Sequence, residues 1–178
     1  MKPEMRKTSK PKISTLILLM TLLVLLGCEQ SQEPVQDLSP QQVTVDDLGY
    51  YCNMIVAYHP GPKAQILLSK RDKAIWFSSV RDAVAFTMLP DEPKTIAAIY
   101  VTAMDQVEWE HPENEMDNWI VAKDAWFVIG SEKRGGMGQL EAVPFRSSAS
   151  AEQFSQAHGG RVVAFSEIPK DYIMNSTE

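Results

Sequence analysis

The 178-residue sequence is short of cysteine, histidine and basic side chains. It holds two cysteines and three histidines, which gives little material for a zinc site of several thiolates and imidazoles. Its 23 Asp and Glu residues outnumber 17 Lys and Arg residues. No dense basic patch is left to hold phosphates, which argues against nucleic-acid binding. Only one long apolar run occurs, at residues 16–26.

The amino-terminal segment has the features of a secretory signal. Five basic residues precede the apolar run, which is short for a membrane span and typical of a signal peptide. The run ends at "LLGC", which resembles the lipobox of bacterial lipoproteins. We therefore expect residues 1–27 to be removed and Cys28 to carry a lipid; the alternative is an uncleaved anchor helix. Glu29, where aspartate would retain a lipoprotein in the inner membrane, favours the periplasmic side of the outer membrane.

The remainder is predicted to be one acidic domain on a tether. Removal of the signal leaves 12 basic and 22 acidic residues in a chain long enough for one domain or two small halves around a core. Residues 28–47 are rich in Gln, Ser and Pro, which predicts a flexible tether. The folded domain is expected at residues 48–174.

Strand and helix patterns alternate from residue 49 onward. Helical spacing of apolar residues predicts helices at 78–89, after an N-cap at Ser79, and at 148–158, before two glycines. Runs of β-branched and aromatic residues predict strands at 50–58, 64–69, 74–77, 95–102, 119–131, 140–145 and 161–165.

A weak internal repeat supports a duplicated unit. The same spacing relates two sets of residues, Phe77, Ser79, Ala83 and Phe86 in the first and Phe145, Ser147, Ala151 and Phe154 in the second. The predicted fold class is therefore α+β. It comprises two similar β-β-α-β halves, at about residues 49–104 and 117–172, packed into one compact unit.

Cys52 would be the only thiol left after lipidation of Cys28, so no intramolecular disulfide could form. One interpretation is a buried structural cysteine. In a strand, however, Cys52 and Met54 would face the same side with Cα atoms about 7 Å apart. A thiolate and a thioether form a soft pair that selects Cu(I) over Zn(II), Ca(II) or Mg(II). A catalytic thiol is a third interpretation, but no triad is evident.

Two further residues are candidate ligands. Met137 lies in "RGGMG", where three glycines predict a loop that would display its thioether; the alternative is a turn with an incidental methionine. His59 lies at an odd offset from Cys52, so only the turn at residues 60–62 could bring it back, and it is the weakest of the four ligand candidates. His111 and His158 are assigned to a surface loop and a helix end.

Long blocks of the sequence resemble the NosL family, the copper-binding accessory lipoproteins of nitrous oxide reductase. The resemblance runs from about Gly49 to Tyr172 and rests on "YCNMIVAYHPGPKAQI", "WFSSVRDAVAFTMLP", "AAIYVTAMD", "AWFVIGSEKRGGMGQLEAVPF" and "HGGRVVAFSEIPKDY". It implies two β-β-α-β halves, a fold similar to the organomercurial lyase domain. It also places the family's cysteine and two methionines on Cys52, Met54 and Met137. One departure is Asn53, where the family commonly has glycine.

The resemblance implies a periplasmic, lipid-anchored protein that binds one Cu(I). It would support assembly of the copper centres of nitrous oxide reductase, together with a membrane ABC-type transporter complex. Soft sulfur ligands would leave an open position at which a partner's ligand could take the metal, and binding to the thiolate should release a proton and weaken in acid. The chain is then not expected to be an enzyme. The alternatives are a thiol-dependent enzyme on an organomercurial-lyase-like fold and a structural lipoprotein.

Overall fold

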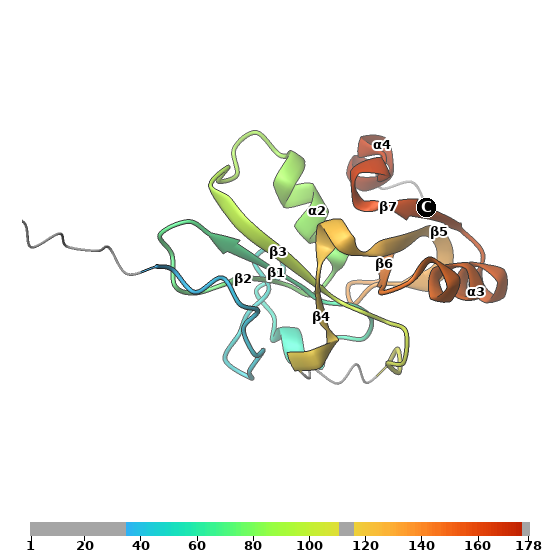
Figure 1. The fold of residues 1–178 in the computed structure, drawn as a ribbon, viewed down its shortest axis with the longest axis horizontal. Coiled ribbons are helices and arrows are strands. Elements are labelled where there is room, and N and C mark those ends of the chain that lie inside the picture. The colour runs from blue at the N-terminus through green and yellow to red at the C-terminus, as the bar shows by residue number, and fades with distance from the viewer. Residues whose placement is uncertain (1–34, 111–115, 176–178) are drawn as a thin grey trace, which may run out of the picture. The chain divides into compact units, whose positions relative to one another are not determined.

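The computed structural model describes residues 35–110 and 116–175, and the described residues from Gln36 onward form one compact unit. Two antiparallel sheets and three α-helices make up the described fold (Figure 1). The strands are β1 (Ala64–Leu68), β2 (Ile75–Phe77), β3 (Ile96–Thr102), β4 (Trp119–Val121), β5 (Trp126–Arg134), β6 (Leu140–Phe145) and β7 (Arg161–Ala164). The helices are α2 (Val80–Met88), α3 (Ser148–His158) and α4 (Lys170–Met174), with short 3-10 helices η1 (Val56–Tyr58), η2 (Met116–Asn118), η3 (Ala122–Asp124) and η4 (Phe165–Glu167).

The two sheets repeat one topology, which confirms the predicted α+β class and agrees with two β-β-α-β halves. The first sheet has the order β2-β1-β3-β4 and the second the order β6-β5-β7. In each half a hairpin leads into a helix and then into a strand beside the first strand of the hairpin. Ser79 and Ser147 occupy the N-cap positions of α2 and α3, as the internal repeat predicts.

The predicted strand 119–131 is wrong as a single element. Residues 122–124 form η3, with Ala122 buried, and this turn redirects the chain from one sheet to the other. β4 therefore pairs with β3 of the first sheet, and only β5 belongs to the second. The boundary between the halves lies after η3 rather than before residue 117.

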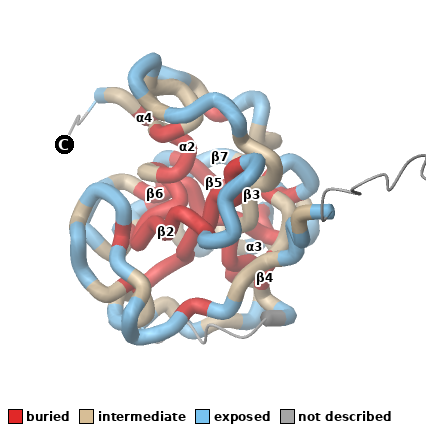
Figure 2. The backbone as a smooth tube through the Cα atoms, turned by 90° about the vertical axis from the view of Figure 1, so that its left-hand side faces the viewer, coloured by how far each residue is buried: buried red, intermediate tan, exposed pale blue. Residues whose placement is uncertain are grey.

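A single apolar core joins the two halves. Phe77 from β2, Phe86 from α2 and Phe127 from β5 belong to one cluster of buried residues, and α2 contacts β6 of the second half as well as β1 and β2. Figure 2 shows the buried segments concentrated in the strands and in α2. Removal of this shared apolar surface from water holds the halves together as one unit.

The start of α2 is stabilised from the second half. The side chain of Ser79 does not cap the helix backbone. Instead, the carboxyl group of Glu141 on β6 accepts a hydrogen bond from the Arg81 amide at 2.9 Å. Its oxygen satisfies one of the N–H groups that have no partner within the helix.

The predicted end of the tether at residue 47 is wrong. Residues 36–47 lie along the first sheet, where Val43 is buried. Gln36 Nε2 donates to the Leu68 carbonyl at 2.8 Å, and the Gln41 backbone exchanges hydrogen bonds with the Gln65 side chain at 2.7 and 2.9 Å. Glutamine is typical of a linker by composition, but here its amides satisfy backbone groups at the end of the β1–β2 hairpin.

Among the helices of the described residues, none has the length and apolar character needed to cross a membrane.

Candidate metal site

Residues 48–58, predicted in large part as a strand, form a tight loop followed by η1. Leu48 pairs with Ile55 in an isolated bridge. The Gly49 amide donates to the Met54 carbonyl at 2.9 Å, and the Asn53 amide donates back to the Gly49 carbonyl at 2.8 Å. The chain reverses at Asn53, whose φ of 54° lies in the left-handed region. Cys52 and Met54 therefore share a closed loop, not one face of a strand.

The conformation of Asn53 explains the single departure from the NosL pattern. Glycine enters the left-handed region freely, and asparagine is one of the few other residues that does so at low cost. Asn53 can therefore adopt the left-handed conformation on which this turn depends.

Cys52 lies in a close-fitting notch. Its Sγ is 3.4 Å from Ser78 Oγ, and a Cβ added at Gly49 would lie 2.5 Å from Sγ and 2.9 Å from Ser78 Oγ. Only glycine fits at position 49 without moving the thiol. Cys52 itself is partly exposed, which differs from the fully buried structural cysteine considered above. Sequence analysis singled out neither Gly49 nor Ser78, because neither is a metal-ligand residue type in a recognisable pattern.

The glycine-rich loop between β5 and β6 reaches across to the same place. A Cβ added at Gly136 would lie 2.7 Å from the His59 Cβ and 3.0 Å from the Ser78 carbonyl oxygen. His59 Nδ1 is 3.1 Å from the Gly136 carbonyl oxygen. The loop that carries Met137 therefore lies against both His59 and the residue that touches the Cys52 thiol. The side chain of Met137 is exposed, as is that of Met54.

His59 is oriented by this contact. A carbonyl oxygen only accepts, so Nδ1 must carry the proton and donate to Gly136. In a neutral imidazole this tautomer has its lone pair on Nε2, the arrangement common in histidines that bind metals. His59 therefore lies against the glycine-rich loop.

A buried lysine holds the His59 turn in shape. Lys63 has no exposed surface, and its Nζ donates to the carbonyl oxygens of His59, Pro60 and Gly61. Burial lowers the pKa of Lys63 to about 8, although Glu141 nearby raises it. Three convergent carbonyls replace the hydration of the ammonium group and fix the backbone that carries His59.

A buried carboxylate supports the glycine-rich loop. Glu141 Oε1 accepts from the amides of Arg81 and Ala142, but Oε2 has no hydrogen-bond partner. A Cβ added at Gly135 would overlap Oε2. Burial raises the pKa of Glu141 to about 7, against the lowering effect of these amides and of the nearby Ser79 hydroxyl.

The other histidine among the described residues, His158, has a partner of its own. His158 lies at the end of α3, as expected for a helix-end histidine, and its Nδ1 is 3.0 Å from Glu132 Oε1 on β5. His111 and Cys28 lie outside the described residues. Within the described ranges, His, Cys, Asp and Glu side chains form no group of three that could hold a metal ion.

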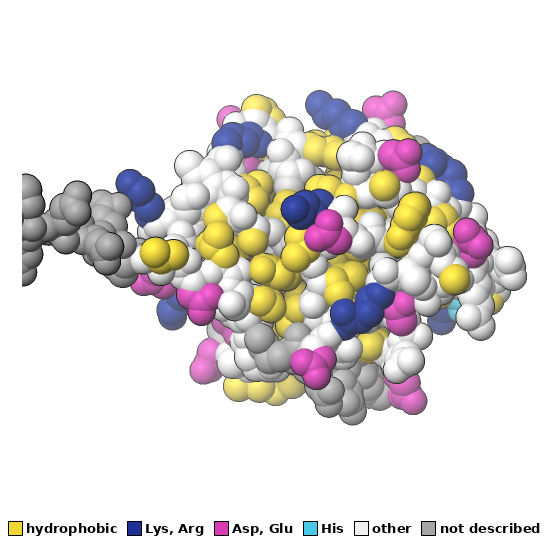
Figure 3. Space-filling model, viewed as in Figure 1, with side chains coloured by type: hydrophobic (Ala, Val, Ile, Leu, Met, Phe, Trp, Pro, Cys, Tyr) yellow, Lys and Arg dark blue, Asp and Glu magenta, His cyan; other side chains and the backbone are white. Residues whose placement is uncertain are grey.

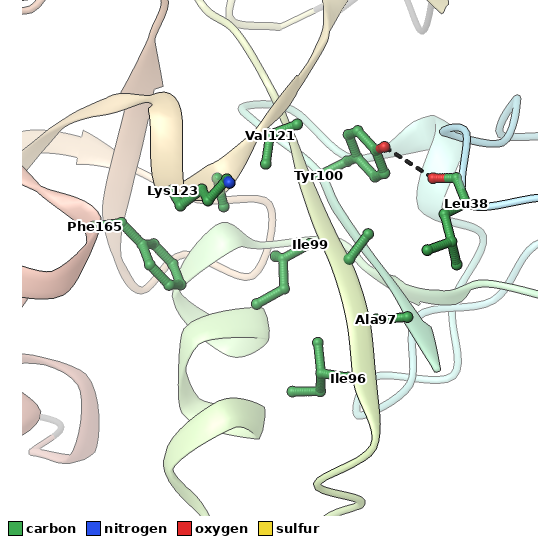
Figure 4. Close-up of a pocket in the computed structure, with 10 residues that line it drawn as sticks. Leu38, Ile96, Ala97, Ile99, Tyr100, Val121, Lys123 and Phe165 are labelled. Carbon is green, nitrogen blue, oxygen red and sulfur yellow. Dashed lines mark hydrogen bonds between the residues drawn. The ribbon is translucent and has the colours of Figure 1, made fainter. Parts of the chain in front are cut away.

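An apolar groove of about 440 Å³ lies beside β3. Its lining includes Ile96, Ile99 and Phe165 (Figure 4), and Figure 3 shows hydrophobic side chains gathered on this face. The Tyr100 hydroxyl donates to the Leu38 carbonyl at its edge, at 2.8 Å. The residues that line the groove include no thiol, thioether or imidazole, so the groove is separate from the sulfur candidates.

Comparison with known proteins points to one family. The NosL family model matches residues 40–173. The chain is 40% identical over 159 residues to the copper-binding lipoprotein NosL of Achromobacter cycloclastes, covering 88% of this chain and 80% of that protein. It is 31% identical over 154 residues to the copper-binding lipoprotein NosL of Stutzerimonas stutzeri, covering 86% and 78%.

A solved structure shares the fold. The crystal structure of the copper chaperone NosL from Shewanella denitrificans superposes with a TM-score of 0.69 at 29% sequence identity. The match covers 77% of this chain and 98% of the solved one.

Proposed function

The chain belongs to the NosL family, and we propose that it is a copper carrier in which Cys52, Met54 and Met137 bind one Cu(I) ion. The observation that carries the proposal is the approach of the two halves at Ser78. Its hydroxyl touches the Cys52 thiol, and its carbonyl oxygen faces the loop that carries Met137. This approach supports a shared site for soft ligands whose positions in the sequence differ by 85.

The proposed ligand set matches the chemistry of cuprous ion. Thiolate and thioether sulfur are soft donors that favour Cu(I), and methionine adds affinity without adding charge. His59, with Nε2 free and its ring fixed by Gly136, is proposed as a fourth or exchangeable ligand. Binding deprotonates Cys52, so copper binding should release a proton and weaken as the pH falls.

Partial exposure of the thiol supports a role in transfer. Cys52 is neither buried nor fully exposed, so a metal held there is reachable by a ligand of another protein. We propose nitrous oxide reductase and its ABC-type assembly complex as the proteins that exchange copper with this chain, by successive ligand replacement. The lipid on Cys28 would hold the carrier at the periplasmic face of the membrane, with the outer membrane favoured.

An anaerobic Cu(I) titration against a chromophoric competitor tests the binding site. One equivalent should bind, Cys52→Ser should abolish stoichiometric binding, and Met54→Ala and Met137→Ala should each weaken it by about tenfold, or roughly 1.4 kcal/mol. Met88→Leu, on α2, is the control and should bind as the unmodified protein does. Wild-type affinity in Cys52→Ser would refute the proposed site.

A further inference from the structure

Exposed apolar side chains lie on the same segments of the chain as the proposed copper ligands. Large hydrophobic residues are normally scattered singly on a protein surface, and a contiguous group signals an interaction site. Six of them, with 38% to 71% of their surface exposed, fall in the Cys52 loop, in η1 and in the glycine-rich loop. This group, the collar, consists of Leu48, Tyr50, Tyr51, Met54, Tyr58 and Met137.

Backbone contacts make the collar continuous across the two halves. Tyr58 directly precedes His59, whose ring donates to the Gly136 carbonyl, and a collar methionine directly follows Gly136. Ser78 lies between the Gly136 backbone and the Cys52 thiol, in contact with both. The collar therefore includes residues of both halves, from the loops that meet at Ser78.

Two collar tyrosines are held rigidly although their rings are partly exposed. The Tyr50 and Tyr51 hydroxyls donate to the two carboxylate oxygens of Glu92, at 3.0 and 2.8 Å. Their rings also pack against each other at 5.0 Å and against Phe86 and Phe77, at 5.4 and 5.8 Å. Side chains fixed before binding lose little entropy when a partner covers them.

The composition of the collar matches protein–protein interfaces. Tyrosine and methionine are enriched at the centres of such interfaces, and lysine is depleted. The collar contains three tyrosines and two methionines. Methionine also adapts to partners of different shape, because its side chain is unbranched and polarizable.

We propose that the collar is the surface through which this protein docks on the protein that accepts its copper. The proposal rests on the proposed function, because ligand exchange requires the acceptor's ligand to come within bonding distance of Cu(I). An acceptor that does so must cover the collar. Its complementary surface is apolar, with a sulfur or imidazole ligand at the centre. Basic residues are expected around that surface, because the carrier without residues 1–27 has 22 acidic and 12 basic residues.

The test compares copper transfer from the Cu(I)-loaded protein to two kinds of acceptor. Copper-free nitrous oxide reductase and its assembly complex are the protein acceptors, and a small water-soluble Cu(I) chelator is the acceptor that needs no docking surface. Tyr58→Ser and Leu48→Ser remove collar contacts without removing a proposed ligand. Trp126→Ser is the matched control, because Trp126 is 40% exposed but lies at the opposite end of β5 from the glycine-rich loop.

Both collar variants should take up one Cu(I) with unchanged affinity and give it to the chelator at the wild-type rate. Transfer to at least one protein acceptor should slow by about tenfold or more, the usual effect of removing an interface anchor. Trp126→Ser should transfer normally. Rates to the protein acceptor should also fall as salt is added.

Failure of this proposal is distinguishable from failure of the proposed function. A wild-type protein that takes up no Cu(I) refutes the copper site itself. Normal loading with unchanged protein-to-protein transfer in both collar variants overturns only the collar, as does transfer to the chelator but to neither protein. Binding to anionic lipid vesicles, or dimerisation of the protein, that is lost in Tyr58→Ser but kept in Trp126→Ser would assign the collar to a membrane or a second copy and would likewise overturn it.

Discussion

Replacement of Glu141 with glutamine should remove a pH dependence of stability between about pH 4.5 and pH 7. Glu141 is fully buried beneath the glycine-rich loop, and its Oε2 has no hydrogen-bond partner. Burial raises its pKa from 4.5 to about 7. The folded protein therefore keeps a proton on this carboxyl over a range in which the unfolded chain releases it.

The sign and size of the effect follow from this difference. Below pH 4.5 Glu141 is protonated in both the folded and the unfolded protein, so its full contribution to stability is present. As the pH rises toward 7, the unfolded state gains by losing its proton, so the free energy of unfolding should fall by about 3 kcal/mol. For a domain of this size such a change corresponds to a melting temperature lower by roughly 6 to 12 °C. The Glu141→Gln variant has no proton to lose and should lack this decline.

Chemical denaturation at half-unit steps from pH 4.5 to 7.5 measures the effect directly. The curves of wild type and Glu141→Gln should converge near pH 4.5 and separate in favour of the variant by pH 7. Burial also raises the pKa of Asp82, but Asp82 is present in both proteins, so the difference between them isolates Glu141. The lowered pKa of Lys63, about 8, acts with the opposite sign and above this range. Parallel curves would refute the assignment of a raised pKa to Glu141.

Substitutions at four further positions test the loops around the site and the attachment of α4. Gly135→Ala would drive a Cβ into the held carboxylate of Glu141 and should lose about 1–3 kcal/mol of stability, with weaker Cu(I) binding, because the loop must shift. In Gly138→Ala the added Cβ would meet no neighbouring atom, but position 138 has a φ of 75°. Calorimetry should therefore show a loss of only about 1 kcal/mol of stability, and titration should show near-normal copper affinity. Equal effects in the Gly135→Ala and Gly138→Ala variants would contradict this reasoning. Asn53→Gly should keep the stability of the wild type, whereas Asn53→Ala should lower the stability measured by thermal unfolding by about 1 kcal/mol. An alanine variant as stable as the wild type would argue against the left-handed turn. Arg81→Met should release α4, whose last carbonyls the guanidinium holds, and hydrogen exchange should then accelerate in that helix but not in α3.

The elements that local sequence patterns determine were predictable. The helices at 80–88 and 148–158 follow from apolar spacing with a serine before each, and the β1–β2 hairpin follows from two apolar runs around a polar turn. The duplicated topology was predicted from the spacing shared by two sets of residues, one that begins at Phe77 and one that begins at Phe145. In each of these cases the residues that form the element are also the residues that bury its apolar face.

The Cys52 segment was predicted wrongly because its aromatic and β-branched residues serve tertiary contacts. Tyr50 and Tyr51 pack on the rings of α2 and β2, and Val56 is buried in a second cluster. The strand propensity of these residues therefore does not determine the backbone conformation of the Cys52 segment. The contacts that assemble the site were not predictable, since Ser78, Gly136 and Glu92 act through distances across the fold. No local pattern marks such residues.

The most direct test of the central claim is X-ray absorption at the copper edge of the Cu(I)-loaded protein, with its variants. The account predicts copper bound mainly by sulfur, with the thiolate contribution lost in Cys52→Ser and one sulfur scatterer lost in each of Met54→Ala and Met137→Ala. Loss of a sulfur in both methionine variants would place ligands from both halves on one ion. A spectrum of nitrogen and oxygen ligands alone, or a sulfur shell unchanged in Met137→Ala, would contradict it.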